Sequence, residues 1–460
     1  MSNLSLPLPL TVLGVGYLGA AHAACLAELG FDVLGLDTDP RRIDALAAGQ
    51  LPFFEPGLEP MLRHHLDSGR LRFTTSYHEA AAFGAVHFLC VGTPQRAGAD
   101  GADLRQLDAC VSRLAPLLTS PCLVVGKSTV PVGTAAALAE DLVRSAPAGH
   151  AVDLAWNPEF LREGRAVEDT LRPDRIVAGV RSPQAESTLR RIYAQPLADG
   201  VPFFATDLAT AELAKVAGNS FLATKISFIN AMSEICDIAA ADVIHLAQIL
   251  GADSRIGREF LHPGLGFGGA CLPKDIRAFA ARAEELGVGQ STRFLREVDA
   301  INLRCRSRVV RLVHDLAGGS VAGRTVGLLG LAFKPDSDDI RDSPALAVAK
   351  ALQEQGARVS AYDPVAMDRA REEYPSLNYA DSVTGAAEDA DVLVILTEWP
   401  EFCEADPDLL AKCVARRNMI DGRNALDPVA WREAGWCYRA LGRPGSDPGA
   451  IHLTERTRPS

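Results

Sequence analysis

Short apolar runs alternate with helical patterns between Leu10 and about Phe204. The strand-like runs read TVLGVG, FDVLGLD, AVHFLCVG, CLVVGKST, DLAWN and RIVAGV. Strands that are apolar throughout are buried on both faces, which is typical of a parallel sheet covered by helices. The alternation therefore predicts such a sheet, with helices on both of its faces.

The pattern becomes helical from Asp207 to about Val313. Apolar residues recur at helical spacing from Ala211 to Ala241 without a proline, which predicts one long helix. From Arg324 to about Leu441 the strand and helix rhythm starts again with RTVGLLGLAF, ARVSAYD and DVLVILTE.

The expected fold class is α/β, with two Rossmann-like, doubly wound parallel-sheet domains joined by a central all-α region that contains the long helix. The predicted boundaries are 1–205, 206–313 and 314–441. The polar segment 442–460 is rich in proline and glycine and is predicted to be a disordered tail.

Length and charge narrow the class of protein. A chain of 460 residues is too long for one hydrophobic core. A net charge of −12 argues against nucleic-acid and anionic-membrane partners, and every apolar run is too short for a membrane span. The N-terminus lacks the basic region of a signal peptide, and the ten cysteines show no metal-ligand spacing. We expect a cytoplasmic protein with reduced thiols and no metal site.

A glycine-rich turn follows the first predicted strand. Gly14, Gly16 and Gly19 form a GxGxxG pattern that opens a helix, and Asp37 ends the next strand. The first glycine permits a tight turn, the second lets backbone approach a pyrophosphate, and the third allows close helix packing. Asp37 stands where a carboxylate can bond a ribose 2′-hydroxyl. The pattern predicts a dinucleotide site.

Asp37 would repel a 2′-phosphate, so NAD is favoured over NADP. Arg41 and Arg42 weaken this preference slightly, because either can bind a phosphate. The segment 354–363 resembles 28–37 and also ends in an aspartate, Asp363. It has no matching glycine turn upstream, so we expect no second NAD there.

The most informative segment is PGLGFGGACLPKD, residues 263–275. Its glycines predict a loop whose backbone wraps a ligand closely. A helix is predicted to begin near Pro273, which places Cys271 at a helix N-terminus, where the macrodipole favours the nucleophilic thiolate. Asp275 lies one turn further along. A small buried cysteine beside a loop is the alternative.

Three other groups of residues are candidates for the site, but each is weak evidence when it is taken by itself. Glu212, Lys215 and Asn219 share one face of the long helix, where a lysine and an amide can stabilise an oxyanion, although such pairs are also common on solvated helices. Two strand ends are followed by NPEFLREG (157–164) and KSTVPVGT (127–134), which offer carboxylates and hydroxyls at the edge where ligands bind. Either is also compatible with an ordinary strand-to-helix turn.

Taken together, these motifs resemble the UDP-glucose/GDP-mannose dehydrogenase family from Gly14 to about Asn424. The matching blocks are GVGYLG, CVGTPQ, KSTVPVGT, WNPEFLREG, AELAKVAGNSFLATKISFIN, GADSRIG, PGLGFGGACLPKD, GLAFKPDSDDIRDSP and DGRN. The resemblance implies an NAD-dependent, four-electron oxidation of the C6 hydroxymethyl group of a nucleotide sugar.

The resemblance also implies residue roles. Cys271 would be the nucleophile that carries a thiohemiacetal and then a thioester. Lys215 and Asn219 would stabilise the oxyanion, and Asp275 would position Lys215 and the hydrolytic water. Glu159 and Thr129 would move protons through water.

The remaining site residues follow from the same resemblance. The cofactor contacts it implies are Gly14, Gly16, Tyr17, Leu18, Gly19, Asp37, Arg41, Thr93, Ser128, Glu163 and Arg341. The substrate contacts it implies are Phe160, Leu161, Arg255, Phe260, Phe267, Gly268, Phe333, Lys334 and Arg423. Arg255 would reach across from a neighbouring subunit, and the central helix would form the core of a homodimer or of a higher homo-oligomer.

The segment RIGREF resembles the UDP-glucose branch of the family, which implies UDP-glucose as substrate and UDP-glucuronate as product. UDP-N-acetyl-hexosamines and GDP-mannose are the alternatives within the family. A two-electron hydroxyacid dehydrogenase and a non-catalytic nucleotide-sugar sensor are the alternatives outside it. The sequence departs from the family at Ala270, Ala231 and Asp342, where Ser, an acid and Glu are usual.

Overall fold

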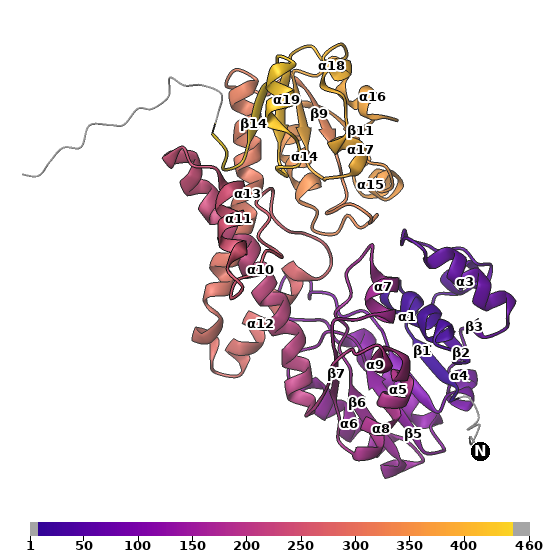
Figure 1. Cartoon of the computed structure of the whole chain (residues 1–460). Coiled ribbons are helices and arrows are strands. Elements are labelled where there is room, and N and C mark those ends of the chain that lie inside the picture. The colour runs from indigo at the N-terminus through magenta and orange to yellow at the C-terminus, as the bar shows by residue number, and fades with distance from the viewer. Residues whose placement is uncertain (1–7, 445–460) are drawn as a thin grey trace, which may run out of the picture. The chain divides into compact units, whose positions relative to one another are not determined.

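The computed structural model describes residues 8–444. They divide into two compact units, 8–221 with 274–296 and 222–273 with 297–444. The two longest helices, α10 (Leu208–Ala239) and α13 (Phe294–Leu316), each contribute residues to both units (Figure 1). The predicted domain boundaries stay a prediction, and the predicted tail lies almost wholly outside the described residues.

The first unit contains an eight-stranded sheet in the order β3-β2-β1-β4-β5-β6-β7-β8. Its strands are β1 (Leu10–Leu13), β2 (Val33–Leu36), β3 (Leu71–Thr74), β4 (Val86–Leu89), β5 (Cys122–Gly126), β6 (Val152–Trp156), β7 (Ile176–Gly179) and β8 (Phe203–Thr206). The sheet is parallel except that β7 pairs antiparallel with β6. The connection between these two strands, 157–175, contains the helix α7 (Ala166–Leu171).

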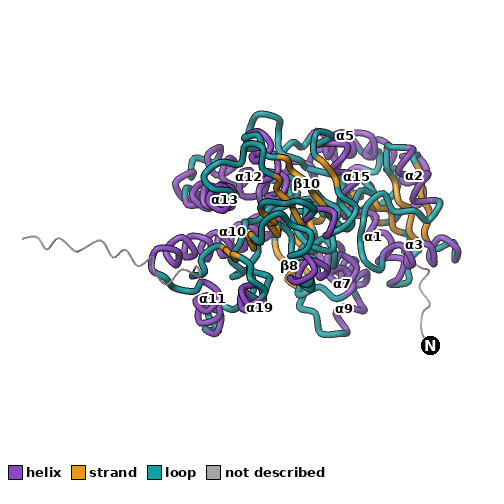
Figure 2. Tube along the Cα trace, turned by 90° about the horizontal axis from the view of Figure 1, so that it is seen from above, coloured by secondary structure: helices purple, strands orange, loops and turns teal. Residues whose placement is uncertain are grey.

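Helices cover both faces of this sheet (Figure 2). One buried apolar cluster joins the strands to α1, α2, α3, α7 and α8, and the other joins them to α4, α5, α6 and the start of α10. The helices are α1 (Tyr17–Glu28), α2 (Pro40–Ala47), α3 (Leu58–Asp67), α4 (Tyr77–Phe83), α5 (Arg105–Leu114), α6 (Thr134–Ser145), α7 (Ala166–Leu171), α8 (Pro183–Ile192), α9 (Ala194–Ala198) and α12 (Leu272–Glu285), with short 3-10 turns at Ala115–Leu117, Gly149–Ala151 and Gly289–Thr292. The predicted α/β class and the long helix are confirmed.

The second unit contains a six-stranded, fully parallel sheet in the order β11-β10-β9-β12-β13-β14. Its strands are β9 (Thr325–Leu329), β10 (Arg358–Tyr362), β11 (Asn378–Tyr379), β12 (Val392–Ile395), β13 (Asn418–Asp421) and β14 (Cys437–Ala440). Its helices are α11 (Val243–Ala252), α14 (Pro344–Glu354), α15 (Met367–Glu373), α16 (Val383–Ala387), α17 (Pro400–Cys403), α18 (Pro407–Leu410) and α19 (Pro428–Glu433). Across the described residues, no helix combines the length and the apolar character that a bilayer span requires.

The repeat seen in the sequence is structural. Asp37 accepts a hydrogen bond from the backbone N–H of Val15, and Asp363 accepts from those of Leu331 and Ala332. Asp363 is fully buried and also accepts from the Trp399 indole, so protein donors surround its carboxylate. In the second unit, Asp363 therefore stabilises the turn that contains Leu331 and Ala332.

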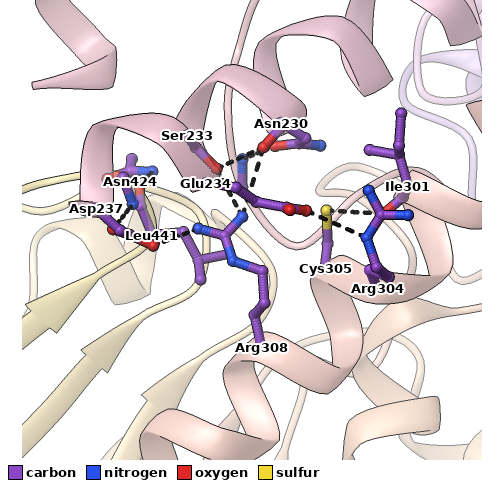
Figure 3. Close-up of polar contacts among 12 residues, drawn as sticks. Asn230, Ser233, Glu234, Asp237, Ile301, Arg304, Cys305, Arg308, Asn424 and Leu441 are labelled. Carbon is purple, nitrogen blue, oxygen red and sulfur yellow. Dashed lines mark hydrogen bonds and ion pairs between the residues drawn. The ribbon is translucent and has the colours of Figure 1, made fainter. Parts of the chain in front are cut away.

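Arg308 connects the two long helices inside the second unit (Figure 3). Its buried guanidinium on α13 donates to Ser233 Oγ at 2.7 Å and to Asp237 Oδ2 at 2.6 Å on α10. Asp237 in turn accepts from the backbone N–H of Gly442 at 2.8 Å, which ties the end of β14 to the same place. One buried cation therefore joins three segments that are distant in sequence.

Replacing this cation tests its structural role. Arg308→Met keeps the length of the side chain but leaves Asp237 and Ser233 without their donor. We expect the free energy of unfolding to fall by about 2 kcal/mol. Urea unfolding followed by circular dichroism measures the change, with Arg304→Met on the exposed side of α13 as the control. Equal stability of the two variants would contradict the role.

Candidate active site

The carboxyl edge of the first sheet gathers most of the predicted site. The glycine turn follows β1, Thr93 follows β4, Thr129 follows β5, and Glu159 follows β6. These four strands are neighbours in the sheet. Loops at the carboxyl ends of parallel strands are where ligands bind in folds of this kind.

The glycine turn has the shape that a dinucleotide requires. Gly14 has a φ of +87°, and a Cβ there would lie 2.9 Å from Val91. A Cβ on Gly19 would lie 1.9 Å from the Gly14 carbonyl oxygen, so only glycine allows α1 to approach the turn. No atom would lie within 4 Å of a Cβ on Gly16. The turn is thus open at Gly16, beside the N-terminus of α1, where backbone N–H groups attract an anion.

Asp37 is held beside this turn. Its carboxylate accepts from the N–H of Val15 at 3.1 Å and from Arg42 Nη1 at 2.9 Å. Arg41 pairs instead with Asp39, and its side chain is 91% exposed. Arg42 is therefore the arginine next to the carboxylate that is predicted to bind the ribose, and the role of Arg41 as a cofactor contact stays a prediction.

Tyr17 takes part in a contact that the sequence did not reveal. Its hydroxyl donates to Glu55, a buried residue between α2 and α3. Glu55 also accepts from the N–H groups of Gly164 and Ala166, each at 2.7 Å. Burial and the Glu55 carboxylate raise the pKa of Tyr17, which keeps its hydroxyl a donor. Glu55 thus ties the glycine turn to the far end of the NPEFLREG segment, next to Glu163.

Lys215 and Glu159 form an ion pair at the sheet edge. Lys215 Nζ lies 2.9 Å from Glu159 Oε1, and the two side chains are only 5% and 12% exposed. The second Glu159 oxygen accepts from the N–H of Leu161 at 2.8 Å. Phe160 covers the pair, with its ring centroid 5.6 Å from Lys215 Nζ. Attraction between two partly desolvated charges of opposite sign holds these two side chains together.

One turn further along α10, Asn219 donates to Asp275 Oδ2 at 2.6 Å. Both side chains are buried, and Lys274 Nζ lies 2.5 Å from the other Asp275 oxygen. The predicted face of α10 therefore presents Lys215 and Asn219 side by side, each fixed by a carboxylate.

The third residue predicted on this face has a structural role. Glu212 accepts from the backbone N–H groups of Gly133 and Ala135 at 2.7 and 2.6 Å. It therefore binds the N-terminus of α6 and docks α10 against the sheet. Burial raises the pKa of Glu212 and these donors oppose that change.

A pocket in the first unit brings several predicted residues together. Thr93, Thr129, Lys274, Asp275 and Arg282 are among its lining residues. Thr93 Oγ1 donates to the Thr129 carbonyl at 2.7 Å, and Ser128 Oγ donates to the Val91 carbonyl at 2.7 Å. These contacts fix the loops that follow β4 and β5.

Cys271 is exposed and directly precedes the first residue of α12. Most other thiols differ from it. Burial raises the pKa of Cys90 to about 12 and that of Cys305 to about 11, which keeps them protonated and unreactive. The alternative of a buried structural cysteine is therefore wrong for Cys271.

The glycines before Cys271 lie close to other parts of the second unit. A Cβ on Gly266 would lie 2.3 Å from Asn302 Oδ1, and one on Gly268 would lie 2.4 Å from the Asp342 carbonyl oxygen. Asn302 also donates to the Phe267 carbonyl and accepts from its N–H. Gly266 and Gly268 are thus required because the loop packs against its own unit, and the expectation that the loop backbone approaches a ligand closely stays a prediction.

The predicted substrate contacts of the second unit fall into two groups. Arg423 donates to the carbonyl oxygens of Leu396, Gly266 and Phe333, so it braces the loop that holds Phe267, Gly268 and Phe333. The other group lies nearer the surface. Arg255 pairs with Asp253 and is 88% exposed, and Phe260 and Lys334 are half-buried. Arg341, which was predicted as a cofactor contact, pairs with Asp339 and is 61% exposed.

The fold and the site define a class of protein. A glycine turn, an aspartate beside it and an ordered set of lysine, asparagine and carboxylate side chains at one sheet edge are typical of nicotinamide-dependent dehydrogenases. The open position at Gly16 and the acceptor at Asp37 fit NAD.

Comparison with known proteins identifies the family. The NAD binding, central and UDP binding domains of the UDP-glucose/GDP-mannose dehydrogenase family match residues 9–197, 209–304 and 327–428. The chain belongs to this family, and its cofactor is NAD.

Relatives match over almost the whole chain. UDP-glucose 6-dehydrogenases of Pseudomonas aeruginosa and Rhizobium meliloti are 42% and 41% identical, with 95% of this chain and 97% and 99% of theirs covered. A UDP-glucose dehydrogenase structure from Pyrobaculum islandicum superposes with a TM-score of 0.88 at 38% identity, covering 96% of this chain and 99% of that one. A UDP-D-ManNAc dehydrogenase from Pyrococcus horikoshii gives a TM-score of 0.82 at 27% identity, covering 95% and 100%.

The Asp37–Arg42 pair predicts a change in cofactor preference. Asp37→Ser removes the acceptor for the ribose and releases Arg42 to meet a 2′-phosphate. We expect kcat/KM for NAD to fall about tenfold or more and the ratio of NADP to NAD activity to rise. Steady-state kinetics with both cofactors measure this, and Arg41→Ser is the control. A wild-type preference for NADP would overturn the role of Asp37.

Proposed function

We propose that this protein is an NAD-dependent UDP-glucose 6-dehydrogenase that oxidises the C6 hydroxymethyl group of UDP-glucose to the carboxylate of UDP-glucuronate. The observation that carries the proposal is the pairing of Lys215 with Glu159 and of Asn219 with Asp275 on one face of α10. The exposed Cys271 begins the helix that carries Asp275. The full-length similarity to UDP-glucose 6-dehydrogenases supports the choice of substrate.

The first oxidation gives an aldehyde. Glu159, with Thr129, takes the C6 hydroxyl proton through a water molecule while C6 gives up a hydride. NAD, when bound, would supply the hydride acceptor, with one NAD molecule for each of the two oxidations. The Lys215 ammonium stabilises the negative charge that develops on the oxygen.

The second oxidation needs a covalent tether. The Cys271 thiolate adds to the aldehyde carbon, and the C–S bond forms as the carbonyl electrons move to oxygen. Asn219 and Lys215 stabilise this oxyanion. The oxyanion collapses as C6 loses its second hydride, which leaves a thioester. Water positioned by Asp275 then attacks the thioester and releases the acid and the Cys271 thiol.

The remaining predicted residues bind the two ligands. The glycine turn, Asp37, Thr93, Ser128 and Glu163 are assigned to the cofactor in the first unit. The diphosphate of the sugar is assigned to Lys334, with Phe267 and Phe333 against the base or the sugar. Arg423 acts on this site through the Gly266 and Phe333 carbonyls that it holds.

Removing the sulfur tests the tether. In Cys271→Ser we expect the overall kcat to fall at least about a thousandfold, because a hydroxyl at this position is a far weaker nucleophile. The first hydride transfer should persist, so aldehyde or a bound adduct accumulates. Stopped-flow NADH absorbance and mass spectrometry detect both. Cys437→Ser, at the other exposed cysteine, is the control, and a near-normal kcat in Cys271→Ser would refute the role.

We also propose that the protein is a homodimer that buries the apolar face of α10. Phe228, Ile235 and Ile238 are 48%, 58% and 89% exposed along this helix, and Ile249 on α11 is 70% exposed. A row of exposed apolar side chains at helical spacing is typical of an interface between subunits. The exposed Arg255 then reaches the partner's substrate site.

The proposed interface predicts a change in mass. Ile235→Glu combined with Ile238→Glu should give a monomer with a several-fold higher KM for UDP-glucose, since the neighbour's Arg255 is lost. Size-exclusion chromatography with light scattering measures the mass. Leu409→Glu introduces a carboxylate at an exposed apolar residue on α18, away from α10 in sequence, and should stay dimeric. A monomeric wild-type protein would contradict the proposal.

A further inference from the structure

Arg282 lies in the last turn of α12 and contacts the loop that follows β5. Its Nε and Nη2 both donate to the Val132 carbonyl oxygen, at 3.0 and 2.8 Å. Its Nη1 donates to Glu285 Oε2 at 2.8 Å, and the Arg282 side chain is 29% exposed. One edge of the planar guanidinium therefore binds a single backbone oxygen, and the rigid fork of donors fixes the direction of this contact.

The peptide group between Val132 and Gly133 is held from both sides. Its carbonyl accepts from Arg282 on α12, and its N–H donates to Glu212 on α10 at 2.7 Å. Gly133 has a φ of +98°, and a Cβ there would lie 3.2 Å from Arg282 Nη2, so the backbone approaches the guanidinium closely. The loop after β5 is thus fixed between two helices, each of which contributes one charged side chain.

The helix α12 is attached to the rest of the first unit near both of its ends. Near its start, Asp275 accepts from Asn219 on α10 at 2.6 Å. About two turns further along, Arg282 makes its contact with Val132. Of residues 277–285 in this helix, only Ala283 is buried, so apolar packing alone holds the second half of α12 weakly.

Thr129 and Asp275 lie on the two segments that Arg282 joins. Thr129 stands three residues before Val132 in the loop, and Asp275 lies on the same helix as Arg282. Thr129, Asp275 and Arg282 all line one pocket. In the proposed mechanism Thr129 moves a proton through water and Asp275 positions the water that attacks the thioester, so turnover depends on where these two groups lie.

We propose that Arg282 is a positioning residue, which holds the Thr129 loop against α12 through the Val132 carbonyl and so sets the distance between Thr129 and Asp275. This inference rests on the proposed function. A basic residue in the last turn of a helix also interacts favourably with the helix dipole, which is a role in stability alone. The two roles predict different kinetics.

Removing the donors tests the positioning role. Arg282→Met keeps an apolar stem but has no donor for Val132. We expect the kcat of the folded variant to fall about tenfold, because a small displacement of a group that handles water slows its step. KM for UDP-glucose should not rise, because no predicted sugar contact lies on the loop after β5. Steady-state kinetics measure both constants.

Two matched variants show which contact is responsible. Glu285→Gln removes the carboxylate partner of Arg282 and leaves the donors to Val132 in place, so its kcat should equal that of the wild type. Arg282→Lys keeps the charge and one donor, and its kcat should lie between those of Arg282→Met and the wild type. If Arg282→Met does not fold, Arg282→Lys should still have a lower kcat than Glu285→Gln.

Hydrogen–deuterium exchange gives a readout that needs no turnover. Releasing the Val132 carbonyl frees the peptide group on one side, so the N–H groups of Gly133 and Ala135, which Glu212 binds, should exchange faster in Arg282→Met. Mass spectrometry of peptides that cover 127–136 measures this exchange, and Glu285→Gln should match the wild type.

Several results would overturn the inference. These are a folded Arg282→Met variant with the kcat of the wild type, unchanged exchange of the loop in that variant, and an equal kcat in Arg282→Lys and Glu285→Gln. A lower melting temperature of Arg282→Met with an unchanged kcat would assign Arg282 to stability alone.

The two hypotheses fail separately. A wild type that forms no NADH from UDP-glucose contradicts the proposed function, whereas the exchange experiment still measures the contact between Arg282 and Val132. An active wild type whose Arg282→Met variant keeps its kcat contradicts the role of Arg282 alone.

Discussion

The ion pair between Lys215 and Glu159 joins the long helix α10 to the carboxyl edge of the first sheet, and the rest of the candidate site depends on this contact. Both side chains are largely shielded from water, so their mutual attraction is strong and separating them is costly. If the pair separated, an uncompensated charge would be left at the sheet edge. The register of α10 against the sheet is therefore fixed, with Glu212 bound to the N-terminus of α6 one turn before Lys215. Asn219, one turn after it, is fixed in the same way.

The segment that carries Glu159 is held at both ends. Asn157 is fixed by Lys127 and Tyr193, and the N–H groups of Gly164 and Ala166 are bound by Glu55. Loops at the end of a strand are ordinarily among the more mobile parts of a fold. Here polar side chains remove that freedom, and a proton acceptor needs this because misplacement by one ångström slows a proton transfer strongly.

Much of the fold could be predicted because its strands are short and apolar throughout. The glycine turn and Asp37 were readable because few arrangements other than a dinucleotide site require those residues together. The strand β3 escaped prediction because two of the four residues in Leu71–Thr74 are not buried and give no apolar run. Likewise, β7 is as apolar as the parallel strands, so nothing in its sequence showed that it pairs antiparallel with β6.

The sequence was less informative about residues whose role is to hold other parts of the protein in place. Glu55 stands between Phe54 and Pro56 with no motif, and its partners are backbone groups more than a hundred residues away. Lys127 has a feature that is visible in the sequence, because it is a charged residue directly after a buried strand. The packing of the glycines before Cys271 could not be predicted, because sequence alone does not show which parts of the protein lie beside a glycine.

The central claim is a double oxidation through a sulfur tether, and the number of NADH molecules formed per UDP-glucose consumed tests it most directly. Absorbance at a limiting, known amount of UDP-glucose, with excess NAD, gives this number. The account predicts two NADH for each UDP-glucose, with UDP-glucuronate as the product. One NADH for each UDP-glucose, with a free aldehyde as the product, would contradict it.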